Sequence, residues 1–520
     1  MGAQQGASGD APTSLHQAWG RAADCSRRQD LGDNRLVASG VPLKPRLEPG
    51  QYGGEWLIPN QDGLVQRVGG DLELSAGRPP SVAVWGDVPL HIEQHPNGLT
   101  SAAFPQRFSY PLLVGELRNG LKVILVEAEV STWQLERAIV SARAALVGPP
   151  SGSTEGPLLV SKIGIQISGL DAFSGIGPLK SFSHPQPGEG FYDHTWQVSP
   201  NPDCEQRWSD DHVALRFGYD STITFGDPFF FRMAFSPVAR LTLADPQPFD
   251  VCLDRWVEPL RRLVSLATGR TEQITYLSMS RPGDSERDDF QVYGSGLDQN
   301  PFASLGNDVR QIDAAFTARS EDISPLQILR GWQRLLDERH PLLETYGTSI
   351  IIPRQHPRST YLLLIQALEG LYGHEHKAEY EERVQQHTAK RAEILDELAG
   401  QAGLPSRVIK FIKKYLMKKP HSGLDECLTE MFVSLPFDVR EELAATGLIQ
   451  EVQRAAGGPV PLPTALRTVR NDLSHGTKGY PTAQLHEAVE ILDRVARAHM
   501  LRVLGCGTAA QERAARGSRF

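Results

Sequence analysis

The 520-residue chain lacks the features of a membrane, secreted or metal-binding protein. It has no run of about 18 apolar residues, so we expect no transmembrane helix. Residues 1–20 contain no basic stretch followed by an apolar one, so no secretion signal is expected. The five cysteines are scattered without a Cys-x-x-Cys pair or a Cys/His spacing, as is typical of reduced thiols in a cytoplasm. The sequence therefore predicts a cytoplasmic protein that contacts no membrane and needs no metal or other cofactor.

A surplus of basic residues is also missing, because the net charge is -9. This charge argues against a general nucleic-acid coat protein, so any RNA contact must come from a local basic patch. The hydrophobic fraction of 40% and the charged fraction of 22% are typical of a globular protein. No Walker A motif, Rossmann glycine motif or nucleophile elbow occurs.

The apolar pattern changes along the chain from a period of two to the period of a helix, and the chain is too long for a single core. We expect a β-rich N-terminal half followed by an all-α helical bundle. The predicted segments are a flexible arm over 1–46, a β-rich domain over 47–282, a linker over 283–322, a helical domain over 323–507 and a flexible tail over 508–520.

Short alternating stretches separated by Gly/Pro-rich turns predict the β-rich half. Ile163, Ile165 and Ile167 show the period of two, and Asn119-Gly120 is a strong hairpin signal. Such strands favour sandwich or barrel-like sheets, as one unit or as two subdomains that meet near 148–152. One helix is predicted to interrupt them, from Leu253 to Val264.

Helical periodicity dominates the second half of the chain. Ser324-Pro325 is typical of a helix start. Further helices are predicted at about 359–373, 376–399, 404–418, 422–434, 463–474 and 482–504. These patterns predict a bundle of mostly antiparallel helices.

The segment Val469-Arg470-Asn471-Asp472-Leu473-Ser474-His475-Gly476 carries the most chemistry. An arginine can neutralise the charge of a pentacovalent phosphate, a histidine can move protons near neutral pH, and an asparagine can orient either group. This set suits metal-free cleavage of a phosphodiester. Arginine and histidine recur at the same spacing in Arg207/His212 and Arg494/His499, but no small amide follows the arginine there. We interpret the first of these pairs as part of a loop and the second as a structural feature of the last helix.

Arg470-Asn471-x-x-x-His475-Gly476, late in an all-α domain and before one long final helix, resembles the HEPN domain (higher eukaryotes and prokaryotes nucleotide-binding). The stretch Tyr361–Leu371, with its single acidic residue Glu369, resembles the first core helix of the ApeA-like HEPN branch. Three segments of the β-rich half are similar to the ApeA N-terminal domain, namely Gly54–Pro59, Val84–Asp87 and Val257–Gly269. The resemblance spans about residues 48 to 505.

The resemblance implies anti-phage defence by abortive infection, in which a HEPN endoribonuclease cuts RNA after infection. It implies that Arg470 and His475 are catalytic, with Asn471 in the polar position after the arginine. Glu369 would support the site, or would form a salt bridge on the helix surface. The implied partners are an RNA substrate, with tRNA as one candidate, an unknown phage trigger, and a second copy of the chain bound through the HEPN domain.

Helical geometry predicts how the motif is used. Asn471 and His475 lie four residues apart and share a helix face, whereas Arg470 points about 140° away from His475. A symmetric dimer would let the arginine of each chain complement the histidine of the other. The reaction would be attack of the ribose 2′-OH on the adjacent phosphate.

A basic stripe is the second candidate site. Phe411 and Tyr415 interleave its cations, which are Arg407, Lys410, Lys413, Lys414 and Lys418. The stripe predicts binding of an RNA backbone, or else a solvated helix whose apolar side packs in the bundle. The main alternative for the whole protein is a catalytically silent HEPN module that senses a phage component or nucleic acid.

Overall fold

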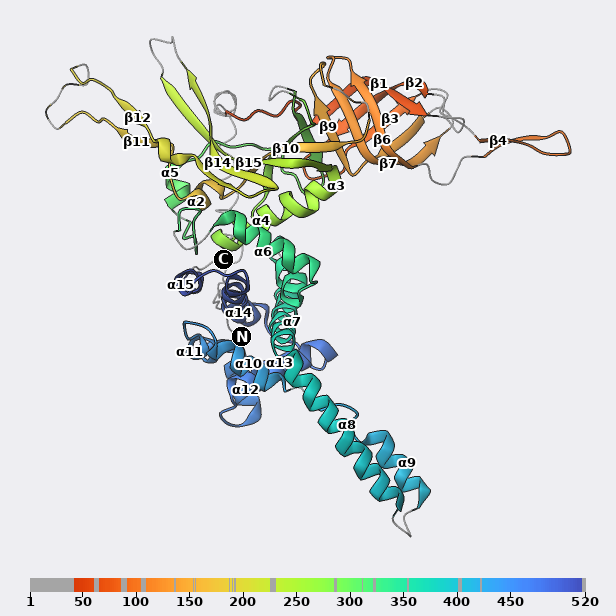
Figure 1. Cartoon of the computed structure of the whole chain (residues 1–520), viewed down its shortest axis with the longest axis vertical. Helices are drawn as coiled ribbons and strands as arrows, with labels where there is room; N and C mark the ends of the chain where they lie inside the picture. The colour runs from red at the N-terminus through yellow and green to blue at the C-terminus, as the bar shows by residue number, and fades with distance from the viewer. Residues whose placement is uncertain are drawn as a thin grey trace, which may run out of the picture.

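The computed structural model has a β-rich half and a helical half, which Figure 1 shows at opposite ends of the molecule. Most of the expected arm, residues 1–41, lies outside the described residues. The structure describes residues 42–516 except for 60–64, 86–90, 104–108, 135–136, 153, 155, 187, 189, 191–192, 225–230, 285–287, 311, 321–323, 353–354, 401–404 and 421–422.

A closed antiparallel barrel forms the first part of the β-rich half. Its strands are β1 (Gly50–Pro59), β2 (Val65–Leu74), β3 (Ser81–Trp85), β8 (Arg137–Ser141), β7 (Lys122–Gln134) and β6 (Ser109–Leu117). The barrel closes because β7 pairs with both β6 and β8. Trp56 fills the interior, and a Cβ at Gly115 would lie 2.5 Å from the Trp56 ring, so this position requires glycine. The predicted Asn119-Gly120 hairpin is confirmed between β6 and β7.

The same sheet continues from the barrel through β9 (Ala144–Gly148). Ala145 and Val147 of this strand pack in the barrel core, whereas Ala144 and Leu146 pack in the second core. The next strands, in spatial order, are β17 (Phe290–Gly294), β16 (Ile274–Ser280), β10 (Leu159–Ile167), β15 (Arg232–Pro248), β14 (Val213–Thr224) and β13 (Gln206–Ser209). Two short hairpins, β4 (His91–Gln94) with β5 (Thr100–Ala103) and β11 (Leu179–Phe182) with β12 (Val198–Pro200), extend away from the sheet (Figure 1).

Helices cover one face of this extended sheet. They are α2 (Leu170–Ser174), α3 (Phe249–Cys252), a π-helical turn (Leu253–Val257) and α4 (Glu258–Thr268). Trp256 and Leu260 from the helices share a core with Ile163, Leu215 and Leu241 from the strands. The predicted sandwich or barrel-like β half is therefore confirmed. The opposite face of β13, β14, β15 and β10 carries charged side chains.

The predicted linker over 283–322 is wrong in one stretch, because β17 is a fully buried strand within it. A strand in the middle of a sheet is buried on both faces, so its apolar and polar residues need not alternate. The strand was therefore not recognised among its polar neighbours in the sequence. The arm prediction over 1–46 is wrong at its end. Leu43 is buried, and the Arg46 guanidinium lies 2.6 Å from the Asp289 carboxylate.

The helical half contains α6 (Pro325–Asp337), a π-helical turn (Leu343–Gly347), α7 (Pro357–Glu375), α8 (Lys377–Gly400), α9 (Ser406–Tyr415), α10 (Leu424–Val433), α11 (Arg440–Ala445), α12 (Gly447–Ala456), α13 (Leu462–His475), α14 (Thr482–Val503) and α15 (Thr508–Arg516), and α5 (Gly306–Arg310) precedes it. The predicted helices are confirmed, although the one predicted over 404–418 ends at Tyr415, and α5, α11, α12 and α15 are additional. The predicted flexible tail over 508–520 is wrong over α15, where Ala510 and Ala514 are buried against α14. None of the described helices is long and apolar enough to cross a bilayer.

One continuous core joins the two halves through α4, α6 and α14. Arg497 of α14 is 1% exposed, and its guanidinium donates to the carbonyls of Leu266 at 2.7 Å and Ala267 at 2.6 Å. These carbonyls lie in the last turn of α4, where backbone acceptors lack partners within the helix. A buried cation of the helical half therefore caps a helix of the β-rich half.

Candidate active site

Helix α13 carries the Arg-Asn-x-x-x-His motif over its last two turns. The helix begins after Pro461 and ends at Gly476, whose φ of 67° is readily adopted only by glycine. Its buried face, which includes Leu466 and Val469, packs in the core. The hydroxyl of Tyr361 on α7 donates to the Leu466 carbonyl at 2.9 Å. The rotation of α13 is thereby set, and the motif lies on its outer side.

Side chains also hold the end of α13 in place. The Asp472 carboxylate accepts hydrogen bonds from the hydroxyls of Tyr480 at 2.7 Å and Thr477 at 2.8 Å. These two hydrogen bonds, with that of Tyr480 the stronger influence, lower the pKa of Asp472. Arg358 at the start of α7 donates to the Leu473 carbonyl at 2.5 Å. His475 therefore projects from a helix end that is tied to both the following loop and α7.

Arg470 lies against α7. Its guanidinium is 3.5 Å from the Glu369 carboxylate and donates to the Asn471 side-chain carbonyl at 3.2 Å. The Arg470 side chain is 37% exposed and that of Glu369 is 42% exposed, so a solvent-borne ligand can reach both. They line a surface hollow of about 470 Å³ whose other lining residues are Leu362, Gln366, Gly370 and Ser474.

His475 and Asn471 lie on the neighbouring stripe of α13, and both are exposed. Among the residues that the structure describes, no hydrogen bond or ion pair engages the His475 ring. Residues 470–475 are helical, as was assumed when the angle between Arg470 and His475 around the helix axis was predicted. One chain therefore presents a positioned arginine and, on another stripe, an unengaged histidine.

Sequence reasoning missed two polar members of the hollow. Ser474 lies four residues after Arg470, so helical spacing alone could have found it. Gln366 lies three residues before Glu369 on α7, and only the packing of α7 beside α13 brings it to the motif.

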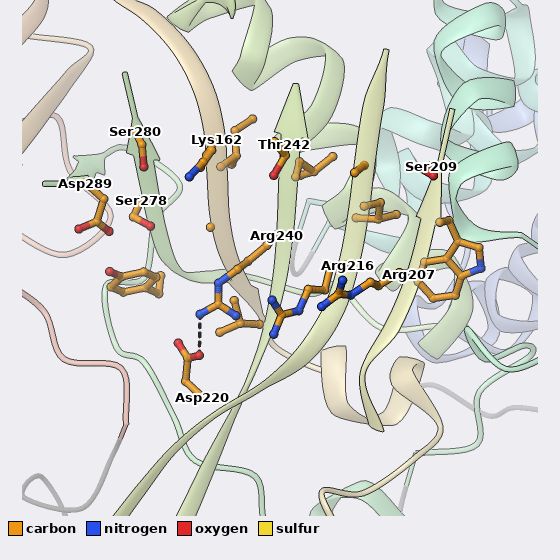
Figure 2. A pocket seen from close by; sticks show the side chains of 18 of the residues that line it. Lys162, Arg207, Ser209, Arg216, Asp220, Arg240, Thr242, Ser278, Ser280 and Asp289 are labelled. Atoms are coloured by element: carbon orange, nitrogen blue, oxygen red, sulfur yellow. Dashed lines mark hydrogen bonds and ion pairs between the residues drawn. The ribbon is translucent and has the colours of Figure 1, made fainter. Parts of the chain in front are cut away.

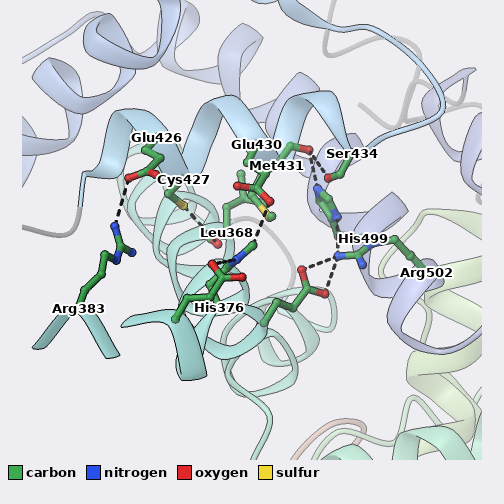
Figure 3. Close-up of polar contacts among 12 residues, drawn as sticks. Leu368, His376, Arg383, Glu426, Cys427, Glu430, Met431, Ser434, His499 and Arg502 are labelled. Atoms are coloured by element: carbon green, nitrogen blue, oxygen red, sulfur yellow. Dashed lines mark hydrogen bonds and ion pairs between the residues drawn. The ribbon is translucent and has the colours of Figure 1, made fainter. Parts of the chain in front are cut away.

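The interpretation of Arg207/His212 as a loop is wrong for Arg207, which lies in β13. The Arg494/His499 pair is structural, as interpreted from the sequence. Arg494 pairs with Glu442 and donates to the Ala515 carbonyl at 2.8 Å. His499 is fully buried, and its Nε2 lies 2.9 Å from the Met431 carbonyl, which requires the Nε2–H form (Figure 3). Burial lowers the pKa of His499 to about 4, so this ring is neutral in the folded protein.

His374, Glu375 and His376 are adjacent residues of types that can bind a metal, but their side chains do not converge on one point. The His374 ring lies 4.4 Å from the His340 ring, Glu375 binds Arg502 at 2.8 Å, and His376 pairs with Glu430 at 3.0 Å. Within the described ranges, no group of three or more His, Cys, Asp or Glu residues could hold a metal ion.

The basic stripe lies on α9 and just beyond it. Helix α9 packs along α8, and Arg391 of α8 donates to the Lys413 carbonyl at 3.0 Å. Together α8 and α9 form an arm that extends away from the rest of the helical half (Figure 1). Neither helix has a buried residue, so the apolar side of α9 is at most half-buried against α8 and does not enter the bundle core, while its basic side is solvated. Phe411 and Tyr415 are each 61% exposed beside the cations.

Comparison with known proteins gives one match. The family described as ApeA N-terminal domain 1 matches residues 51–332, which is more than half of the chain. The matched region runs from β1 through β17 and into α6, and so includes the stretch expected to be a linker. No curated protein and no solved structure matches the chain.

Proposed function

This chain belongs to the ApeA family of anti-phage proteins, and from that premise we propose that its helical half is a metal-independent HEPN endoribonuclease. The observation that carries the proposal is the placement of Arg470. Two acceptors, Glu369 and Asn471, hold its guanidinium in an open hollow, and the same helix presents an unengaged His475 to solvent.

The chemistry follows from these groups. The ribose 2′-oxygen attacks the adjacent phosphorus, the bond from phosphorus to the 5′-oxygen breaks, and a 2′,3′-cyclic phosphate remains. His475 takes the 2′-OH proton or supplies a proton to the leaving 5′-oxygen. Arg470 stabilises the charge that develops on the phosphate oxygens. Glu369 acts as a positioning residue, because its carboxylate holds the guanidinium in one orientation.

We place the active unit in a homodimer formed through the helical half. Arg470 faces α7, whereas His475 lies on the neighbouring stripe of α13, so one chain offers the two groups in different directions. A two-fold axis near the end of α13 would bring Arg470 of one protomer to His475 of its partner.

The arm formed by α8 and α9 is the proposed RNA contact. Helix α8 begins two residues after α7 ends, and Arg391 lies 22 positions beyond Glu369. At 1.5 Å per helical residue, the basic part of the arm reaches up to roughly 30 Å from the hollow. A substrate bound at both places must therefore be an extended or folded RNA, such as a tRNA, rather than a dinucleotide. Exposed Phe411 and Tyr415 offer stacking surfaces between the cations.

Expression of variants in bacteria, followed by mapping of RNA ends, tests the proposal. Arg470→Ala and His475→Ala should abolish toxicity and RNA cleavage. Arg467→Ala is the matched control, because Arg467 lies one turn earlier on α13, is 38% exposed, and pairs only with Asp425 among the described residues. His486→Ala is the control for the histidine, since its side chain is 44% exposed on α14.

Cleavage should persist in EDTA and leave a 2′,3′-cyclic phosphate or a 3′-phosphate, with a 5′-hydroxyl on the other fragment. Products with a 5′-phosphate, or complete inhibition by chelation, would contradict the mechanism. Intact RNA after expression of the wild-type chain during infection would favour the alternative, a silent HEPN module that senses a phage component or nucleic acid.

A further inference from the structure

A large cavity lies in the β-rich half, far along the chain from the α13 motif. Its volume is about 600 Å³, which is within the range of pockets for small ligands. It opens on the face of β13, β14, β15, β10 and β16 that helices α3 and α4 do not cover. Figure 2 shows its charged side chains rising from neighbouring strands.

Three arginines stand directly opposite one another across the cavity floor. Arg207 of β13 pairs in register with Arg216 of β14, which pairs in register with Arg240 of β15. Strands lie about 4.8 Å apart, so the row spans roughly 10 Å. Like charges directly opposite each other destabilise a sheet. Three such residues in one row repel one another, and a bound anion would reduce the repulsion that their carboxylate partners leave.

On β10 the row ends at a glycine, close to the Ser278 hydroxyl of β16. Gly164 is the register partner of Arg240, and it has no side chain to fill the floor. A Cβ at this position would lie 2.7 Å from the Ser278 hydroxyl. Hydroxyl-bearing residues of β16 line this end of the cavity, namely Tyr276, Ser278 and Ser280. They can donate to ligand oxygens, and Tyr276 offers a ring for stacking.

Carboxylates neutralise only part of the positive charge. Glu205 is shared by Arg207 and Arg216, Asp220 binds Arg240 at 2.5 Å, and Asp289 is engaged by Arg46. Lys162 on β10 has no ion-pair partner among the described residues. The lining and its direct partners thus hold five cations and three carboxylates, which leaves two positive charges in a protein of net charge -9.

One nitrogen in the row also lacks a partner. The Nε of Arg216 is buried, and within the described part of the chain it makes no hydrogen bond. A buried donor without an acceptor is costly, and because the Arg216 side chain as a whole is 42% exposed, a small rotation would bring this nitrogen to a ligand oxygen. We propose that this cavity binds a small phosphorylated ligand of nucleotide size, with its phosphate groups along Arg207, Arg216 and Arg240 and beside Lys162.

The site is independent of the proposed ribonuclease, so it is tested in the full-length His475→Ala protein. Calorimetry would measure the binding of ATP, tripolyphosphate and a single-stranded oligoribonucleotide. The two variants are Lys162→Gln and Arg216→Gln, and the control is Arg143→Gln. Arg143 is 38% exposed, close to the 42% of Arg216, and is likewise ion-paired, but it lies outside the cavity. Thermal unfolding would verify that all three variants fold.

We expect ATP to bind and each cavity variant to weaken its binding by about tenfold, because each removes a charge-assisted contact to phosphate. Arg143→Gln should bind ATP as the parent protein does. Tripolyphosphate binding as tight as that of ATP would support recognition through the phosphates, and weaker binding would support an added contact to the base and sugar. The proposal is overturned if neither ATP nor tripolyphosphate binds, if only the oligoribonucleotide does, or if both cavity variants keep the parent affinity.

Discussion

Replacement of Arg497 by leucine should uncouple the two halves of this protein. The substitution keeps the apolar part of the side chain up to Cδ but removes the guanidinium from a site that is 1% exposed. Two hydrogen bonds, to the Leu266 and Ala267 carbonyls, are lost together. Both carbonyls belong to the last turn of α4 and would remain buried without these donors, although the Ala267 carbonyl would keep the Ala315 N–H at 2.8 Å.

The expected cost follows from the kind of hydrogen bond removed. A hydrogen bond that involves a charged group contributes about 1.5–3 kcal/mol, so the loss of two should lower the free energy of unfolding by about 3–6 kcal/mol. The favourable interaction of a cation with the carboxyl end of α4 would also be lost. Such a change is a large fraction of the about 5–15 kcal/mol that usually separates folded from unfolded protein.

Urea denaturation followed by tryptophan fluorescence would measure the effect, since Trp256 and Trp332 are buried in the core that joins the halves. The control is Arg334→Leu on α6. Arg334 is 64% exposed and lies 4.0 Å from Glu338, so its loss should cost about 0.5 kcal/mol or less. A change below about 1 kcal/mol for Arg497→Leu would refute the reasoning, because it would mean that other donors or water satisfy the α4 carbonyls at little cost.

Two further predictions concern the helical half. In a mixture of Arg470→Ala and His475→Ala chains, heterodimers should carry one intact hybrid site and recover part of the RNA cleavage; a strictly monomeric protein that cleaves RNA at full rate would contradict the shared site. Acidification should destabilise the protein through His499, because the pKa of its buried ring is about 4 in the folded state and near 6.5 when exposed, so only the unfolded chain gains a proton as the pH falls from about 6.5 to 4. Urea titrations should assign about 2 kcal/mol of lost stability between pH 7 and pH 5 to this group, and His499→Gln should lose correspondingly less; an unchanged pH dependence in the variant would show that His499 is not responsible.

Local sequence determined most of the elements. Period-two apolar residues predicted strands such as the one through Ile163 and Ile167, and Asn119-Gly120 predicted its hairpin because this pair readily adopts the required turn. The helices of the second half were predicted because an amphipathic helix must bury one stripe of side chains. The Arg470-Asn471-x-x-x-His475 motif was recognised because its residues lie within one and a half turns.

Prediction from the sequence failed where burial or packing removed the usual alternation of apolar and polar residues. Phe290–Gly294 is a strand buried on both faces, and its polar flanks suggested a linker. The segment after Thr508 is polar and short, yet Ala510 and Ala514 are buried against α14, and Arg513 donates to the Ala315 carbonyl at 2.6 Å. Neither the buried strand nor the docked helix could be inferred from composition, because each depends on the residues that pack against it from elsewhere in the chain.

The chemistry divides in the same way. By itself, the sequence determined that an arginine, an amide and a histidine share one helix, because helical spacing is a local property. Only the tertiary structure decided that Glu369, a hundred positions earlier, lies beside Arg470, and that Arg207, Arg216 and Arg240 form a row across three strands. The reason is that strand register and helix packing are set when the whole core forms. A residue's neighbours in the sequence therefore do not indicate which distant residues it will contact.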